Sequence, residues 1–252
     1  YQMDVYLPQL ENKRIAVVGN QTSLIGTTHL VDSLISRSIK VVKVFCPEHG
    51  FRGDGDAGAK IDDGIDDKTG LPVISLYGDN KKPKPELLDS IDVIVFDLQD
   101  VGVRFYTYIS TLHYVMEAAA EKGIKVLLLD RPNPNGHIVD GPVRTPGFES
   151  FIGMHPVPVL YGMTIGEYGQ MINGEKWMKD SLKCDLTVIE ILNYRHKDSY
   201  SLPVPPSPNL KTDNAIILYP SLCFFEGTMV SVGRGTSTPF ELFGSPDFPR
   251  KE

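Results

Sequence analysis

Four apolar runs in this 252-residue sequence each end in polar side chains that could bind a ligand or move a proton. Ligands of an open parallel sheet bind beyond the carboxyl ends of its strands. We therefore expect the four endings to meet at one rim and to build a site there. The endings are Asn20-Gln21-Thr22, Pro47-Glu48-His49-Gly50, Asp100-Val101-Gly102-Val103-Arg104 and Asp130-Arg131-Pro132-Asn133.

Glu48 is the strongest candidate for acid–base chemistry. It follows an apolar run directly and lies between Phe45 and Phe51. A carboxyl group among apolar side chains has its charged form disfavoured, which suits a general acid at neutral pH. His49 and Arg52 would act in the opposite direction if they lay close. From position alone, a solvated loop residue or a structural ion pair is an equally good interpretation.

The segment 104–108 combines the guanidinium of Arg104 with the phenols of Tyr106 and Tyr108. Aromatic rings with polar tips are good platforms for sugars, and arginine pairs with carboxylates. Core packing of the rings and a backbone hydrogen bond of Arg104 are the alternatives. Two glycine-bounded loops carry Glu226 and Arg234, although turn chemistry explains such loops comparably well.

Composition and missing motifs exclude several classes of protein. The net charge of −7 and the lack of a basic stripe argue against nucleic-acid binding. The sequence has no run of 18 apolar residues, so we predict no transmembrane helix. Three cysteines without a CxxC pair, and aspartates that miss the EF-hand spacing, predict no metal site. The GxGxxG match at 53–58 does not join the first strand to its helix, so no dinucleotide cofactor is predicted.

Continuous β-branched runs that alternate with helical stretches indicate strands buried on both faces of a sheet. The predicted fold is α/β, a Rossmann-like, doubly wound and mostly parallel sheet. Strands are expected at 15–18, 41–45, 73–77, 93–98, 126–129 and 186–191. Helices are expected at 29–36, 85–88, 108–122 and 164–178.

The proline-rich stretch at 203–208 is predicted to be either a stiff extended linker or a wall of the site. We predict a Rossmann-like catalytic domain over 1–210. Residues 211–252 are predicted to begin a smaller C-terminal α/β domain, with a helix at 213–224 and a strand at 229–233. The 23 glycines and 19 prolines exceed average usage and predict many shaped loops.

Six segments in a fixed order give the chain a family resemblance from about residue 10 to its end. They are Lys13-Arg14-Ile15-Ala16-Val17-Val18-Gly19-Asn20-Gln21-Thr22-Ser23, Pro47-Glu48-His49-Gly50-Phe51-Arg52-Gly53, the stretch from Asp97 to Tyr108, Leu129-Asp130-Arg131-Pro132-Asn133-Pro134, Phe225-Glu226-Gly227-Thr228, and Gly233-Arg234-Gly235-Thr236 with Pro239-Phe240-Glu241. Together they resemble the NamZ-type exo-β-N-acetylmuramidases, long catalogued as a bacterial family of unknown function.

The resemblance implies a glycoside hydrolase that releases N-acetylmuramic acid from the non-reducing end of peptidoglycan fragments. Its active site would lie in the cleft between a Rossmann-like domain and a smaller C-terminal domain. Glu48 matches the family's proposed catalytic acid. Muropeptides or disaccharides from peptidoglycan are the expected partners, without a cofactor, and export to the periplasm, the medium or a lipoprotein anchor is expected. Family members continue further, so the second domain is expected to be truncated at Glu252.

A glycosidase also needs a second group, and the candidates in order are Glu226, Asp130 and Asp100. His49, beside the acid, is a further catalytic candidate. The acetamido group of the sugar could assist instead of a protein carboxylate. The lactyl carboxylate of muramic acid should face an arginine. The substrate-binding candidates are Arg104, Arg52 and Arg234 for that carboxylate, Asn20 and Asn133 for ring hydroxyls or the acetamido group, and Tyr106 as a platform. Asp100 is a substrate-binding candidate as well.

Two other functions remain as hypotheses. The same cleft could bind amino sugars or muropeptides without catalysing a reaction. The presence of Glu48, His49 and Arg104 argues against this hypothesis. A nucleotide-dependent oxidoreductase or transferase on a Rossmann core is disfavoured, because the first strand lacks an orthodox glycine turn.

Overall fold

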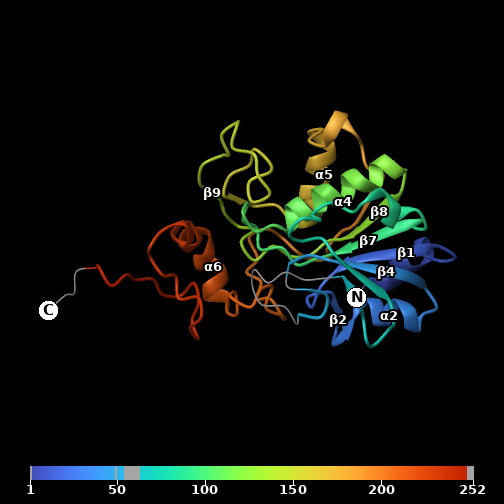
Figure 1. The fold of residues 1–252 in the computed structure, drawn as a ribbon, viewed down its shortest axis with the longest axis horizontal. Coiled ribbons are helices and arrows are strands. Elements are labelled where there is room, and N and C mark those ends of the chain that lie inside the picture. Colours follow the sequence, from blue (N-terminus) through green and yellow to red (C-terminus); the bar gives the residue numbers. More distant parts are fainter. Residues whose placement is uncertain (1, 49, 54–62, 249–252) are drawn as a thin grey trace.

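A seven-stranded sheet forms the centre of the computed structural model, which describes residues 2–48, 50–53 and 63–248 (Figure 1). Six strands are parallel, and the strand order is β11-β8-β7-β1-β4-β6-β5. The short β5 (Gly64–Ile65) pairs antiparallel with β6 at one edge. The parallel strands are β1 (Arg14–Gly19), β4 (Lys40–Cys46), β6 (Pro72–Ser75), β7 (Val93–Asp97), β8 (Lys125–Leu129) and β11 (Leu186–Ile189).

Counted along the chain, the six parallel strands follow the order 3-2-1-4-5-6 of the Rossmann fold. The predicted mostly parallel α/β sheet is therefore confirmed. The point where the strand order reverses lies between β1 and β7, which pair from Ile15↔Val93 to Gly19↔Asp97.

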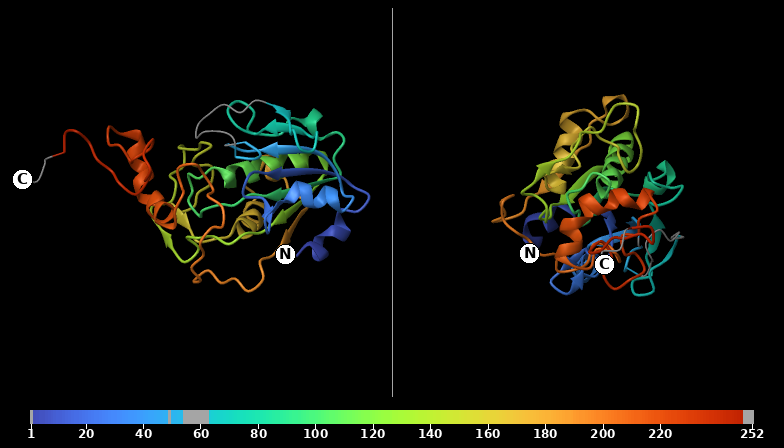
Figure 2. Two further views of the ribbon diagram at one scale, coloured as in Figure 1. Left: turned by 90° about the horizontal axis from the view of Figure 1, so that it is seen from below. Right: turned by 90° about the vertical axis from the view of Figure 1, so that its left-hand side faces the viewer.

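Helices cover both faces of the sheet, as the continuous apolar strands require. Alternate residues of β1 enter separate cores: Ala16 and Val18 pack with α4 (Tyr108–Lys122) and α5 (Ile165–Gly174), and Ile15 and Val17 pack with α1 (Met3–Tyr6) and α2 (Leu30–Ser36). Figures 1 and 2 show α4 and α5 over one face and α2 over the other.

The remaining short elements lie in the connections. They are η1 (Leu7–Gln9), the pair β2 (Leu24–Ile25) and β3 (Thr28–His29), α3 (Pro85–Leu88), the pair β9 (Val139–Asp140) and β10 (Leu160–Tyr161), and η2 (Lys179–Ser181). None of the described helices has the length and apolar character that crossing a membrane requires.

Helix α5 begins as predicted, with a capping box between Thr164 and Glu167. It ends at Gly174 rather than at 178, because Lys176 takes a left-handed backbone conformation with φ 56°. The predicted helix 213–224 is present as α6 (Asp213–Leu222), followed by the 3-10 helix η3 (Cys223–Gly227).

The strand predicted at 229–233 is wrong. The chain there makes an isolated bridge between Ser231 and Gly244, and Gly233 and Gly235 have φ values of 78° and 82°, which an extended strand does not allow. Beyond α6 the chain lies past one end of the sheet and then runs away from it (Figures 1 and 2).

Candidate active site

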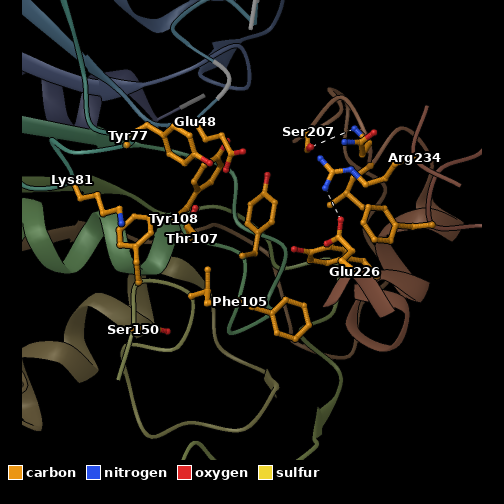
Figure 3. Close-up of a pocket in the computed structure, with 18 residues that line it drawn as sticks. Glu48, Tyr77, Lys81, Phe105, Thr107, Tyr108, Ser150, Ser207, Glu226 and Arg234 are labelled. Atoms are coloured by element: carbon orange, nitrogen blue, oxygen red, sulfur yellow. Dashed lines mark hydrogen bonds and ion pairs between the residues drawn. The ribbon is translucent and has the colours of Figure 1, made fainter. Parts of the chain in front are cut away.

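A cavity of about 550 Å³ lies at the carboxyl ends of β4, β6 and β7. Its volume is within the range of small-ligand sites, roughly 300–1,000 Å³. One wall comes from the loops that follow these strands, and another comes from α6 and the segment after it (Figure 3). The polar lining residues are Glu48, Tyr77, Lys81, Tyr106, Thr107, Tyr108, Ser150, Ser207, Asn209, Tyr219, Glu226 and Arg234.

Glu48, half-buried, lines the wall formed by the strand ends. Tyr77, which follows β6, lines the same wall, and its phenol lies close enough to interact electrostatically with the Glu48 carboxylate. Burial and the charge of Glu48 both raise the pKa of Tyr77, so the phenol stays protonated at neutral pH. The neighbouring strand therefore places a neutral phenol beside the Glu48 carboxylate.

Glu226 and Arg234 lie across the cavity from Glu48 (Figure 3). Their ion pair joins Glu226 Oε1 to Arg234 Nη1 at 2.5 Å, and Glu226 Oε2 lies 3.2 Å from Cys223 Sγ. Within the described part of the chain, Glu48 and Glu226 are the carboxylates that line the cavity. Two carboxylates on facing walls are the arrangement that glycoside hydrolysis uses.

Four phenols are among the residues that line the cavity, and two of them, Tyr106 and Tyr108, are largely buried. The Tyr106 hydroxyl donates to the carbonyl of Pro206 at 2.8 Å, and Asn20 Nδ2 donates to the Tyr108 hydroxyl at 2.8 Å. The two phenol rings pack edge to face, with centroids 4.8 Å apart. Such fixed, amphipathic rings suit a sugar, which presents both C–H faces and hydroxyl groups.

Family models match both walls of this cavity. The model described as the N-terminal part of exo-beta-N-acetylmuramidase NamZ matches residues 15–214, and the model for the C-terminal part matches residues 217–252. The chain belongs to the NamZ exo-β-N-acetylmuramidase family. Glu48 and Tyr77 lie in the N-terminal NamZ match, and Glu226 and Arg234 lie in the C-terminal one.

Relatives of known name or structure agree with this assignment. The chain is 47% identical over 251 residues to the peptidoglycan beta-N-acetylmuramidase NamZ of Bacillus subtilis strain 168, and the match covers 96% of this chain and 59% of that protein. A DUF1343 family protein from Bacteroides fragilis superposes with a TM-score of 0.92 at 47% identity, covering 100% of this chain and 67% of the other. A second protein of that family from B. fragilis gives 0.86 at 36%, covering 95% and 62%.

The chain thus spans about three fifths to two thirds of the length of these NamZ-family relatives.

Four of the predicted site residues line the cavity of this NamZ-family chain: Glu48, Tyr106, Glu226 and Arg234. His49 lies outside the described residues, as do Asp54 and Asp56 of the GxGxxG match. The other six predicted residues have partners elsewhere in the protein.

The two asparagines predicted to bind the sugar are buried instead. Asn20 accepts hydrogen bonds from the backbone and hydroxyl of Thr22, at 2.9 and 2.6 Å, and acts on the cavity only through Tyr108. Asn133 bonds to the Met163 carbonyl and the Asn135 backbone, both at 2.8 Å. Both side chains satisfy backbone groups of loops that cannot pair within the sheet.

Asp130, predicted as a second catalytic group, holds the start of α5. Its oxygens accept hydrogen bonds from Thr164 Oγ1 at 2.9 Å and from Gly166 N at 2.7 Å. Burial raises its pKa to about 6, while these donors act in the opposite direction. A carboxylate at a helix N-terminus stabilises the helix, and Asp130 does not line the cavity.

The arginines expected to face a ligand carboxylate are also engaged. Arg104 Nη1 donates to the carbonyls of Pro142 and Val157 at 2.7 and 2.6 Å and lines a neighbouring hollow of about 510 Å³. Arg52 pairs with Asp66 at 2.6 Å and with Asp32 at 3.1 Å. Neither side chain lines the cavity that holds Glu48.

Asp100 is buried as well, with 4% of its surface exposed. Its Oδ2 accepts hydrogen bonds from the Tyr161 hydroxyl and from Gly102 N, whereas its buried Oδ1 has no hydrogen-bond partner among the described residues. Burial raises the pKa of Asp100 to about 6, against partial compensation by those donors. It therefore contributes to the scaffold of the site and not to its lining.

We expect Asp100 to make stability depend on pH. Its folded-state pKa exceeds the unfolded value near 3.9, so the folded state binds more protons between these values. Stability from this group is highest below pH 4 and falls as pH rises to about 6. The free energy of unfolding of wild type minus that of Asp100→Asn should fall by about 2 kcal/mol from pH 4 to pH 7, at about 1.4 kcal/mol per tenfold change in proton affinity. Urea denaturation across this range measures it; a constant difference would contradict the assignment.

Several lining residues were not predicted, including Tyr77, Lys81, Ser207, Asn209 and Tyr219. Tyr77 is the last residue of the third predicted strand and Lys81 follows it, so both lie at the strand end where ligands of a parallel sheet bind. Ser207 lines the cavity, in agreement with the site-wall interpretation of 203–208, whereas the segment around 150 reaches the cavity through a loop whose path depends on tertiary packing.

Proposed function

We propose that this protein is an exo-acting β-N-acetylmuramidase that releases N-acetylmuramic acid from the non-reducing end of peptidoglycan fragments. The observation that carries the proposal is that Glu48 and Glu226 lie on facing walls of one phenol-lined cavity. Membership of the NamZ family and the name of the B. subtilis relative support the substrate class.

In this proposal Glu48 is the general acid. Its proton passes to the glycosidic oxygen while the bond from that oxygen to C1 of the sugar breaks, and the bonding electrons leave with the oxygen. The neutral phenol of Tyr77 lies beside this carboxyl group. Tyr106 and Tyr108 line the cavity next to the sugar, and their fixed positions help to hold the oxocarbenium-like ring in place.

Glu226 is our candidate for the second group, because Asp130 and Asp100 are held away from the cavity by their own hydrogen bonds. Its ion pair with Arg234 fixes the carboxylate on the facing wall. Glu226 would act on C1 directly or through water, and assistance by the sugar's acetamido group remains the alternative.

Hydrolysis of two chromogenic glycosides tests this function with the protein in its full natural length. We expect release of 4-nitrophenol from the β-N-acetylmuraminide and little from the β-N-acetylglucosaminide. If calorimetry shows binding of N-acetylmuramic acid and neither glycoside is hydrolysed, the protein is a sugar-binding protein and not an enzyme. Absence of both binding and turnover would overturn the proposal.

We also propose that residues 1–210 and 211–252 belong to two domains that share this cavity, and that the protein is exported and serves cell-wall recycling. The support for export is the substrate, since peptidoglycan lies outside the cytoplasmic membrane. Fractionation of the source cells, with detection of the protein by antibody, tests the location.

A further inference from the structure

The positively charged side chains that line the cavity differ in whether they form an ion pair with a carboxylate of the protein. The cations among the described lining residues are Lys81 and Arg234. Arg234 is paired with Glu226 at 2.5 Å, so its charge is compensated inside the protein. Lys81 has no ion pair within the described chain, and its Nζ lies 4.8 Å from the centroid of the Phe151 ring.

The neighbouring lysine shows the contrast. Lys82 Nζ contacts Glu117 and Glu121 of α4, each at 2.7 Å, which fastens the loop after β6 to that helix. Lys81 therefore stands next to a fixed point, and its side chain extends toward the cavity (Figure 3). Lys81 is half-buried. Its ammonium group lies over an aromatic ring and is not paired with a carboxylate of the described chain, so it can still bind an anionic ligand.

The ring under Lys81 is itself fixed. Phe151 stacks on Tyr114 of α4 with an interplanar angle of 9°, and Ser110 Oγ donates to the Phe151 carbonyl at 2.6 Å. The cation is thus held by two contacts to one helix, through Lys82 and through Phe151. A positioned charge loses less conformational entropy on binding than a free surface lysine does.

We propose that Lys81 binds the lactyl carboxylate of the muramic-acid ring and is the residue that selects this sugar over N-acetylglucosamine. This inference rests on the proposed function and replaces the expected arginine by a lysine. The two sugars differ by the lactyl ether at C3, whose carboxylate is the charged feature that distinguishes them. Figure 3 shows Lys81 on the same side of the cavity as Glu48, across from Arg234 and Glu226.

The test compares Lys81→Met and Lys81→Arg with wild type on three chromogenic glycosides: the β-N-acetylmuraminide, its lactyl methyl ester and the β-N-acetylglucosaminide. Loss of one charged hydrogen bond predicts that Lys81→Met raises KM for the muraminide about 10- to 100-fold with little change in kcat. Lys81→Arg should restore most of the binding. For the ester and the glucosaminide, wild type and Lys81→Met should have similar constants.

Lys84→Met is the matched control, because Lys84 is exposed, lies three residues away and does not line the cavity. An unchanged KM of Lys81→Met for the muraminide would overturn the inference, as would an equal rise for the ester. Calorimetry with N-acetylmuramic acid and N-acetylglucosamine repeats the comparison without catalysis. Calorimetry also separates this inference from the proposed function. If the wild-type protein binds N-acetylmuramic acid without hydrolysing the glycosides, and Lys81→Met weakens that binding, the enzymatic activity is rejected but the role of Lys81 stands.

Discussion

Glu48→Gln is expected to lower kcat for the 4-nitrophenyl muraminide by about 10²–10⁴-fold, the usual contribution of a general acid. The amide keeps the size of the side chain and can still interact with the neighbouring phenol of Tyr77, but it cannot supply a proton at neutral pH. KM should change little, since the side chain's volume and its contact are retained. Initial rates at saturating substrate measure the effect.

The leaving group distinguishes the acid role from a merely structural one. A 2,4-dinitrophenolate leaves with little need for protonation, so the dinitrophenyl muraminide should restore most of the lost kcat to Glu48→Gln. A sugar leaving group needs a proton most, so natural disaccharide fragments should show the largest loss. An equal loss on all three substrates would remove Glu48 from the acid role.

Two further variants serve as controls for Glu48→Gln. Glu86→Gln changes the same charge at an exposed position on α3, and its rates should equal those of wild type. Glu226→Gln should slow the dinitrophenyl substrate as well, because a base or nucleophile acts whatever the leaving group is. Added azide should then recover part of that rate if Glu226 is the second group. The opposite leaving-group patterns of Glu48→Gln and Glu226→Gln would assign the two carboxylates.

The sheet could be predicted because the strands carry their own signal. Ile15–Val18 and Val93–Phe96 read as continuous apolar runs since both faces of each strand are buried, and the pairing follows from the βαβ alternation. The segment 229–233 looks similar in composition, with Val230 and Val232. It fails as a strand because Gly233 at its end and Gly235 beyond it take positive φ, and within the described residues it pairs only through the isolated bridge from Ser231 to Gly244.

The site was harder to predict, because a polar residue at a strand end can serve either a ligand or the backbone. Glu48 and Asn20 both follow β-strands, yet Glu48 lines the cavity and Asn20 is fully buried against Thr22 and Tyr108. Sequence position places a side chain at the correct edge of the sheet. The direction in which it points depends on which backbone groups the loop leaves unpaired, and that requires the tertiary structure.

Side chains of the protein also fill the switch point between β1 and β7, where Rossmann folds usually hold their ligand. Ser23 Oγ donates to the Asp97 carbonyl at 2.5 Å and accepts from Asn20 N at 3.0 Å. A Cβ at Gly19 would lie 2.7 Å from the same Oγ, so the turn is tightly packed. The cavity therefore opens beside the switch point, at the ends of β4 and β6, where Glu48 and Tyr77 lie.

Arg131→Met should be the most destabilising change among the residues that looked functional in the sequence. Arg131 makes a two-pronged contact with Asp97 at the end of β7, Nε–Oδ1 at 2.6 Å and Nη2–Oδ2 at 2.9 Å. The Asp97 side chain is 3% exposed and that of Arg131 is 19% exposed. Removing one partner of such a pair leaves a buried charge and costs about 3–5 kcal/mol.

For a chain of this size the expected loss corresponds to a fall in Tm of about 10 °C, measured by circular dichroism. The double variant Asp97→Asn with Arg131→Met should recover part of it, because the orphaned charge is then gone. Arg195→Met removes an exposed pair with Asp198 and should cost less than about 1 kcal/mol. If Arg131→Met kept the wild-type Tm but raised KM, Arg131 would bind substrate, and the Asp-Arg-Pro-Asn segment would belong to the site after all.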